Sequence, residues 1–177
     1  MIKRIMVPVD GSQLGERALV VAGDLAESLA ATIVIARVVP PLAPGRYAPD
    51  LLRQVEETQA KDAETYLASV AERLVGDRLA VESRLLRGPV AATLAAQAAK
   101  ERCDLIVLTS HGMGGLASTV FGSVAQKLLH AAPCPVLVVR STAADLESDE
   151  ELEECRADEA LITEASRLAA KSTAEHD

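Results

Sequence analysis

Glycines and hydroxyl residues gather in the segment from Thr109 to Ser123, directly after the apolar run DLIVL over 104–108. Its glycines can adopt positive φ and let backbone N–H groups approach a ligand without a Cβ in the way. Successive amides in such turns form an anion-binding nest. Gly122-Ser123 opens a predicted helix whose first amides lack an internal partner and whose end carries partial positive charge. The pattern predicts a phosphate-binding segment built mainly from backbone, with a tight glycine-rich turn as the alternative.

A second polar segment, Pro8-Val9-Asp10-Gly11-Ser12, follows the first apolar run of the chain. In open α/β sheets, ligands bind beyond the carboxyl ends of the strands, where the strand order reverses. If the strands that precede the two polar segments are neighbours, both segments face one crevice. The chain contains neither the GxxxxGK[ST] phosphate loop nor a GxGxxG after its first strand. Nucleotide binding is therefore predicted from glycines and free amides alone.

Apolar runs of strand length alternate with helical patterns along the first 140 residues, which predicts one α/β domain with a parallel sheet and helices on both faces. Ser12 is a candidate N-cap. The alternating pattern over 79–86 is typical of a strand near a sheet edge, whereas the continuous runs, 136–139 among them, predict strands buried on both faces. The expected strands are 2–10, with its continuous run at 5–9, and 32–39, 79–86, 104–110 and 135–140. Helices are expected after Ser12 with apolar positions through Leu29, from 49 to about 76, after Gly88-Pro89 with apolar positions through Ala98, and around 123–131.

The composition argues against some classes of function. The 177 residues include no Trp, one Phe and two Tyr, so aromatic platforms for nucleobase stacking are not expected. After Ser141 there are twelve acidic and three basic residues, which leaves a nearly neutral body with 14 acidic and 15 basic residues. A body without a basic stripe argues against nucleic-acid binding. The acidic segment 141–177 is predicted to be a solvated, partly helical or disordered tail, with a regulatory or partner-binding arm as the alternative.

Three widely spaced cysteines, Cys103, Cys134 and Cys155, form no CxxC pair or His/Cys cluster, so no zinc site is expected. A reducing compartment suits them best. No segment approaches membrane-spanning length, and the first residues lack a signal-peptide pattern. We therefore expect a cytoplasmic protein with no membrane contact.

Four sequence features together resemble the universal stress protein family: VPVDGS at the end of the first strand, RGPVAATL, DLIVLTSHGMGGL, and FGSVAQKLLHAAPCPVLVVR. They spread over residues 1–140. The ATP-binding branch of that family carries a glycine, two residues, a glycine, nine residues and then Gly-Ser or Gly-Thr. Here Gly112 and Gly122-Ser123 match this spacing, and Thr109 stands in place of the first glycine.

The resemblance implies a five-stranded sheet in the order 3-2-1-4-5, which would make the first and fourth strands neighbours. It also implies an ATP site, with Mg²⁺ or Mn²⁺ held through the phosphates and no metal ligand set in the protein. Pro8 and Asp10 would line the adenine and ribose, and Val38 would pack on the adenine. The remaining implied contacts wrap the ribose and phosphates: Thr109, Ser110, His111, Gly112, Met113, Gly114, Gly115, Gly122, Ser123, Val124 and Ala125.

Members of this family form homodimers through the last strand, and the apolar edge segment 135–140 would be covered in that way. No residue set supplies a base, a nucleophile and a metal ligand together, so we interpret the chain as a nucleotide-binding stress sensor or switch with at most slow ATP hydrolysis. Asp10 and the lone His111 are assigned to turn or ligand contacts rather than catalysis. A nucleotide-free dimeric interaction module and a weak ATPase remain as alternatives, and a protein partner is expected but not identified.

Overall fold

The computed structural model describes residues 1–42, 49–76, 79–110 and 121–140. Strands and helices alternate along these residues as expected, and the predicted helices 49–76 and 123–131 are found with those bounds. The structure has β1 (Arg4–Pro8), α1 (Gln13–Leu29), β2 (Thr32–Val39), α2 (Pro49–Gly76), β3 (Ala80–Arg87), α3 (Val90–Lys100), β4 (Leu105–Thr109), α4 (Ser123–Ala131) and β5 (Val136–Val139).

The five strands form one parallel sheet in the order β3-β2-β1-β4-β5, which confirms the predicted fold. In the register of the central strands, Ile5 of β1 lies opposite Ile33 of β2 on one side and Leu105 of β4 on the other. β1 and β4 are therefore neighbours although about 100 residues separate them in the chain. Their carboxyl ends, with the two polar segments that follow them, meet at the same edge of the sheet.

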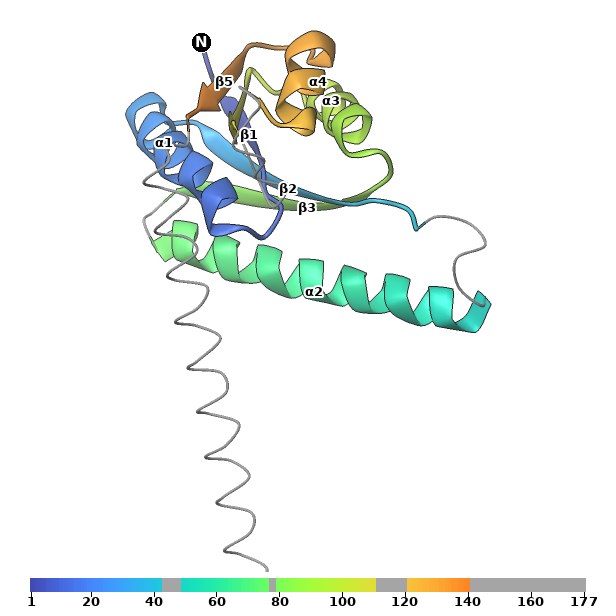
Figure 1. Ribbon diagram of the computed structural model, residues 1–177. Coiled ribbons are helices and arrows are strands. Elements are labelled where there is room, and N and C mark those ends of the chain that lie inside the picture. The colour runs from blue at the N-terminus through green and yellow to red at the C-terminus, as the bar shows by residue number, and fades with distance from the viewer. Residues whose placement is uncertain (43–48, 77–78, 111–120, 141–177) are drawn as a thin grey trace, which may run out of the picture. The chain divides into compact units, whose positions relative to one another are not determined.

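Helices cover both faces of the sheet, with α1 and α2 on one side and α3 and α4 on the other (Figure 1). Side chains alternate along the inner strands, so each strand contributes to two hydrophobic clusters. Ile5, Val7, Ile33 and Ile35 pack toward α1 and α2, whereas Met6, Val34, Ile106 and Leu108 pack toward α3 and α4.

The two edge strands differ in character. β3 is only partly buried, as its alternating sequence predicted, and it carries Glu82 and Arg84. The prediction from hydrophobicity that 136–139 is buried on both faces was wrong, since Leu137 is 38% exposed. The edge position implied by the family resemblance was confirmed, because β5 is the other edge strand. A strand with a neighbour on one side only leaves its other side open, whatever its hydrophobicity.

A cluster of four charged side chains joins β1, β3 and the end of α3, away from the carboxyl edge of the sheet. Arg4 bonds Glu82 at 2.9 Å and Glu101 at 2.7 Å, and Arg84 bonds the same two carboxylates. The hydrogen bond from Arg4 is the main cause that lowers the pKa of Glu82 to about 2. The cluster thus contributes to stability at neutral pH and takes no part in the site described below.

Within the residues that the structure describes, no helix is both long enough and apolar enough to cross a membrane.

Candidate functional site

A cavity of about 770 Å³ opens at the carboxyl ends of β1, β2 and β4. Pockets of this size hold small molecules and cofactors. The sheet order brings these three strand ends together at the place where the chain order reverses, which is where ligands bind in open α/β sheets. Nine residues predicted from the sequence line the cavity: Pro8, Asp10, Val38, Thr109, Ser110, Gly122, Ser123, Val124 and Ala125. The other five, His111, Gly112, Met113, Gly114 and Gly115, lie outside the described residues.

The turn between β1 and α1 is built by Asp10 and Ser12. One carboxylate oxygen of Asp10, Oδ1, accepts hydrogen bonds from the Ser12 amide at 3.0 Å and from its hydroxyl at 2.6 Å. Ser12 Oγ in turn accepts from the Gly15 amide at 3.0 Å, which confirms Ser12 as the N-cap of α1. Gly11 has φ +92°, a conformation that favours glycine. Asp10 therefore shapes the cavity wall by fixing this turn.

The opposite wall joins the end of β4 to the start of α4. Thr109 and Ser110 are buried, and the Ser110 amide donates to the Val139 carbonyl at 2.8 Å. The Gly122 amide donates to the Ser110 carbonyl at 2.7 Å. These bonds hold the first turn of α4 against the end of β4, so its amides lie beside the cavity.

The first turn of α4 has no side-chain cap and no acidic residue. Gly122 is its N-cap, and the first amide bonded within the helix is that of Gln126, which donates to the Gly122 carbonyl at 3.0 Å. The amides of Ser123, Val124 and Ala125 precede it and have no partner inside the helix. All three residues line the cavity, so the helix presents to it amide donors without a partner inside the helix, together with partial positive charge.

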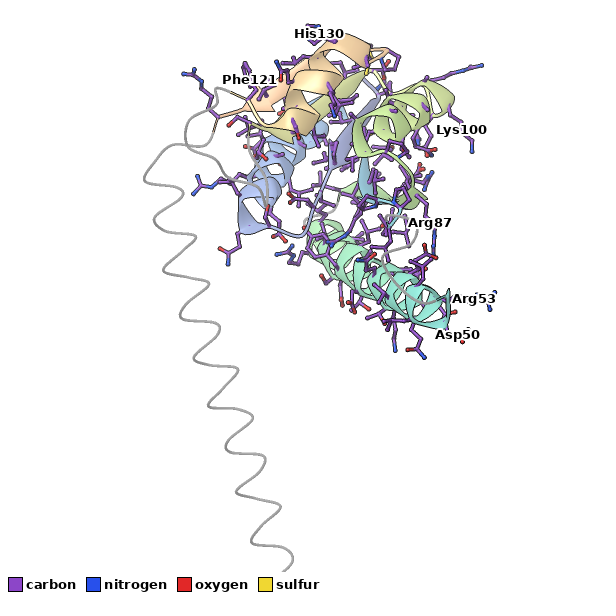
Figure 2. All side chains as sticks on the ribbon, turned by 45° about the vertical axis from the view of Figure 1, so that its right-hand side comes forward. Asp50, Arg53, Arg87, Lys100, Phe121 and His130 are labelled. Carbon is purple, nitrogen blue, oxygen red and sulfur yellow. The ribbon has the colours of Figure 1, made fainter. Side chains whose placement is uncertain are left out.

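The base of the cavity is apolar. Ala36 and Val38 of β2 and Leu108 of β4 line it, together with Val90 and Leu94 of α3. Phe121, which precedes α4 by two residues and is labelled in Figure 2, lines it as well. An apolar wall beside a set of hydrogen-bond donors suits a ligand with a flat apolar part and an anionic part.

Sequence reasoning missed four polar residues of the cavity: Arg37 of β2, Gln59 and Asp62 of α2, and Gln126 of α4. A signal for Arg37 was present, because it is the only charged residue in the apolar run TIVIARVV. Gln59 and Asp62 carried a weaker signal. Their spacing places them on the same side of α2 as Tyr66, but only the fold brings that side to the carboxyl end of β2.

Arg37 lies over the ring of Tyr66, with its guanidinium carbon 4.9 Å from the ring centre. The Tyr66 hydroxyl donates to Glu16 Oε1 at 3.0 Å, and Arg73 bonds the other oxygen of Glu16 at 2.8 Å. Burial raises the pKa of Tyr66 above its usual range, and the nearby Glu16 carboxylate adds to that shift. Tyr66 therefore stays protonated and fixed, and it gives Arg37 a rigid support.

The described residues offer binding groups rather than a reactive centre. No group of three His, Cys, Asp or Glu among residues 1–42, 49–76, 79–110 and 121–140 could hold a metal ion. The described polar groups of the cavity are backbone amides, hydroxyls, one guanidinium, two carboxylates and two amide side chains. This arrangement can orient an anionic ligand and shield its apolar part.

Comparisons with known proteins agree with this fold. The model of the universal stress protein family matches residues 1–140. A universal stress protein of Thermus aquaticus is 32% identical over 148 residues, which cover 79% of this chain and all of that protein. A universal stress protein structure from Lactobacillus plantarum aligns with a TM-score of 0.72 at 24% identity, covering 78% of this chain and 98% of the other.

Two further solved structures share the fold and are described with nucleotides. A protein of this family from Arabidopsis thaliana with AMP bound has a TM-score of 0.59 at 15% identity, covering 81% of this chain and 94% of the other. A universal stress protein in complex with cAMP has a TM-score of 0.60 at 23% identity, covering 80% and 98%. On the family match and the Thermus relative, the chain belongs to the universal stress protein family.

Proposed function

We propose that this chain binds an adenine nucleotide, ATP in the first place, and acts as a nucleotide-dependent switch in a stress response. The observation that carries the proposal is the first turn of α4. Its amides at Ser123, Val124 and Ala125, which have no partner inside the helix, line a cavity whose base is apolar. Phosphates suit the amides, and a purine suits the apolar wall.

The cavity suggests how the nucleotide would lie. The phosphates would accept hydrogen bonds from the α4 amides and the Ser123 hydroxyl, next to Thr109 and Ser110. The base would pack on Val38, and the ribose would lie near Pro8 and Asp10. Mg²⁺ or Mn²⁺ would be held by phosphate oxygens and water, since the described residues supply no ligand set for a metal. The structures described with AMP and cAMP support an adenine ligand.

Bound nucleotide is the direct test. The protein would be purified without added nucleotide and denatured, and the supernatant would be run on ion-exchange HPLC. Near-stoichiometric ATP or ADP is the expected result. An empty protein whose melting temperature does not change with Mg-ATP would contradict nucleotide binding, and a nucleotide-free interaction module would then be the better description. The change in melting temperature with AMP and with ADP would rank these nucleotides against ATP by their affinity for the protein.

Catalysis is at most a minor property under this proposal. Asp10 Oδ1 already accepts two hydrogen bonds from Ser12, which assigns it to the turn. Backbone amides bind phosphates well but do not activate water. We expect slow ATP hydrolysis, and a steady-state turnover that is lost in His111→Ala would contradict this expectation.

We also propose that two copies pair through the segment 135–140. β5 is an apolar edge strand with Leu137 exposed, whereas the other edge strand, β3, carries Glu82 and Arg84. Charged edge strands resist pairing and apolar ones favour it. Leu137→Lys should convert a dimer to a monomer in light scattering after gel filtration, while Ser83→Lys on β3 should not. A monomeric wild-type chain would contradict the proposal.

Two further proposals concern the acidic segment 141–177 and the location of the protein. The acidic segment 141–177 would act toward a protein partner or the cavity, which a chain ending at residue 140 would test by nucleotide affinity and partner capture. A cytoplasmic location fits Cys103 and Cys134, which are both free thiols.

A further inference from the structure

Arg37 is the only lysine or arginine among the described residues that line the cavity. Its side chain extends from β2, near the carboxyl end of that strand. Two described carboxylates line the same cavity, Asp10 and Asp62, but within the described residues the structure records no ion pair between Arg37 and either of them. The cavity thus contains a guanidinium whose recorded contact is with a ring and not with an anion.

The guanidinium is held in place by its surroundings. It stacks on Tyr66, which is itself fixed by Glu16 and Arg73. It also lies close to Gly11: a Cβ built there would be 2.5 Å from Arg37 Nη1 and 3.3 Å from its Cζ. A side chain at position 11 would therefore displace Arg37. A guanidinium that is already ordered loses little entropy when it binds a planar pair of oxygens.

Arg37 lies at the end of the cavity away from α4. β1 separates β2 from β4, and neighbouring strands are about 4.8 Å apart, so the strand that carries Arg37 is roughly 10 Å from the one that leads to α4. Phosphates bound at the first turn of α4 would place the nucleoside between them and β2. Arg37 would then meet the nucleoside part of the ligand, close to the turn formed by Asp10 and Gly11.

We propose that Arg37 binds a second anionic group on the nucleoside, a phosphate on the 2′ or 3′ oxygen of the ribose. The site would then accept, besides ATP, adenosine nucleotides that carry phosphate both at the 5′ position and on a ribose hydroxyl. This inference rests on the proposed adenine-nucleotide function and specifies the ligand of that site. An arginine that recognises a ribose phosphate in this way is known chemistry at the switch point of α/β sheets. Arg37 carries the planar fork of N–H donors that such a phosphate requires. Among the described residues, no recorded ion pair joins it to a carboxylate.

The test compares AMP with adenosine 2′,5′-bisphosphate and adenosine 3′,5′-bisphosphate by isothermal titration of the nucleotide-free protein. The readout is the ratio of dissociation constants, AMP over bisphosphate, within each variant. We expect at least one bisphosphate to bind wild type about tenfold more tightly than AMP, as one charge-assisted contact gives. In Arg37→Gln the ratio should fall to about 1, and Arg37→Lys should retain part of it.

Arg53→Gln is the matched control. Arg53 lies near Asp50 in the first turns of α2 (Figure 2) and does not line the cavity, so the ratio should stay at its wild-type value. A wild-type ratio of 1, or an unchanged ratio in Arg37→Gln, would overturn the role of Arg37 while AMP binding still supports the proposed function. If neither AMP nor the bisphosphates bind, the proposed function itself fails, and this inference fails with it.

Discussion

Replacing Ser123, the first residue of α4, with glutamate should stabilise the free protein and at the same time lower its affinity for nucleotide. Ser123 is exposed, lines the cavity and begins a helix with no side-chain cap and no acid in its first turn. In Ser123→Glu the new carboxylate faces the helix dipole, which should stabilise the free protein by about 0.3–1 kcal/mol. The same charge would lie beside the proposed phosphates. At a separation of about 5 Å and effective dielectric constants of 20–80, each pair of unit charges repels by about 1–3 kcal/mol.

The expected result is therefore a free protein that melts at the wild-type temperature or higher, with affinity for Mg-ATP about 5- to 150-fold lower. Thermal melting and isothermal titration measure the two quantities. The matched control is Ala92→Glu, an exposed position in the first turn of α3, which also lacks a side-chain cap and an acidic residue. It should add the same charge and leave nucleotide affinity near wild type. Undiminished binding of Mg-ATP by Ser123→Glu would refute the placement of phosphates at α4, and a lower melting temperature would refute the reasoning on the dipole.

Two further predictions concern stability. Gly15→Ala would place a Cβ 2.7 Å from Asp10 Oδ1, so it should lower the free energy of unfolding in urea by about 1–3 kcal/mol. The same change at Gly23, also in α1, meets only an ordinary contact at 3.6 Å and should be neutral or stabilising; equal effects at the two positions would contradict the argument from geometry. Glu82 has a folded-state pKa of about 2 against an ordinary 4.5, so its contribution to stability is present above about pH 4.5 and is lost as the pH falls toward 2. In Glu82→Gln, the free energy of unfolding should therefore fall less between about pH 4.5 and pH 2 than in the wild type. An equal fall in both proteins would show that the bond to Arg4 does not persist in solution.

Local sequence determined the elements of this fold. Continuous apolar runs and one alternating run indicated the strands, apolar residues at helical spacing indicated helices, and α2 and α4 have the predicted bounds. Ser12 was predicted as an N-cap because capping depends on one side chain and amides three residues away. The alternation of strands and helices was enough for a parallel sheet with two covered faces. The strand order came from resemblance to a family, since no local pattern states which strands are neighbours.

Tertiary structure decided what surrounds the candidate site. Arg37, Gln59 and Asp62 share no motif, and they reach one cavity only because α2 packs where β2 ends. The exposure of Leu137 likewise could not be predicted from an apolar run, because burial depends on having a neighbour on both sides. The glycines and hydroxyls after β4 indicated a binding segment from their own chemistry. The residues that face it from β2 and α2 depended on contacts between distant parts of the chain, which side-chain periodicity does not encode.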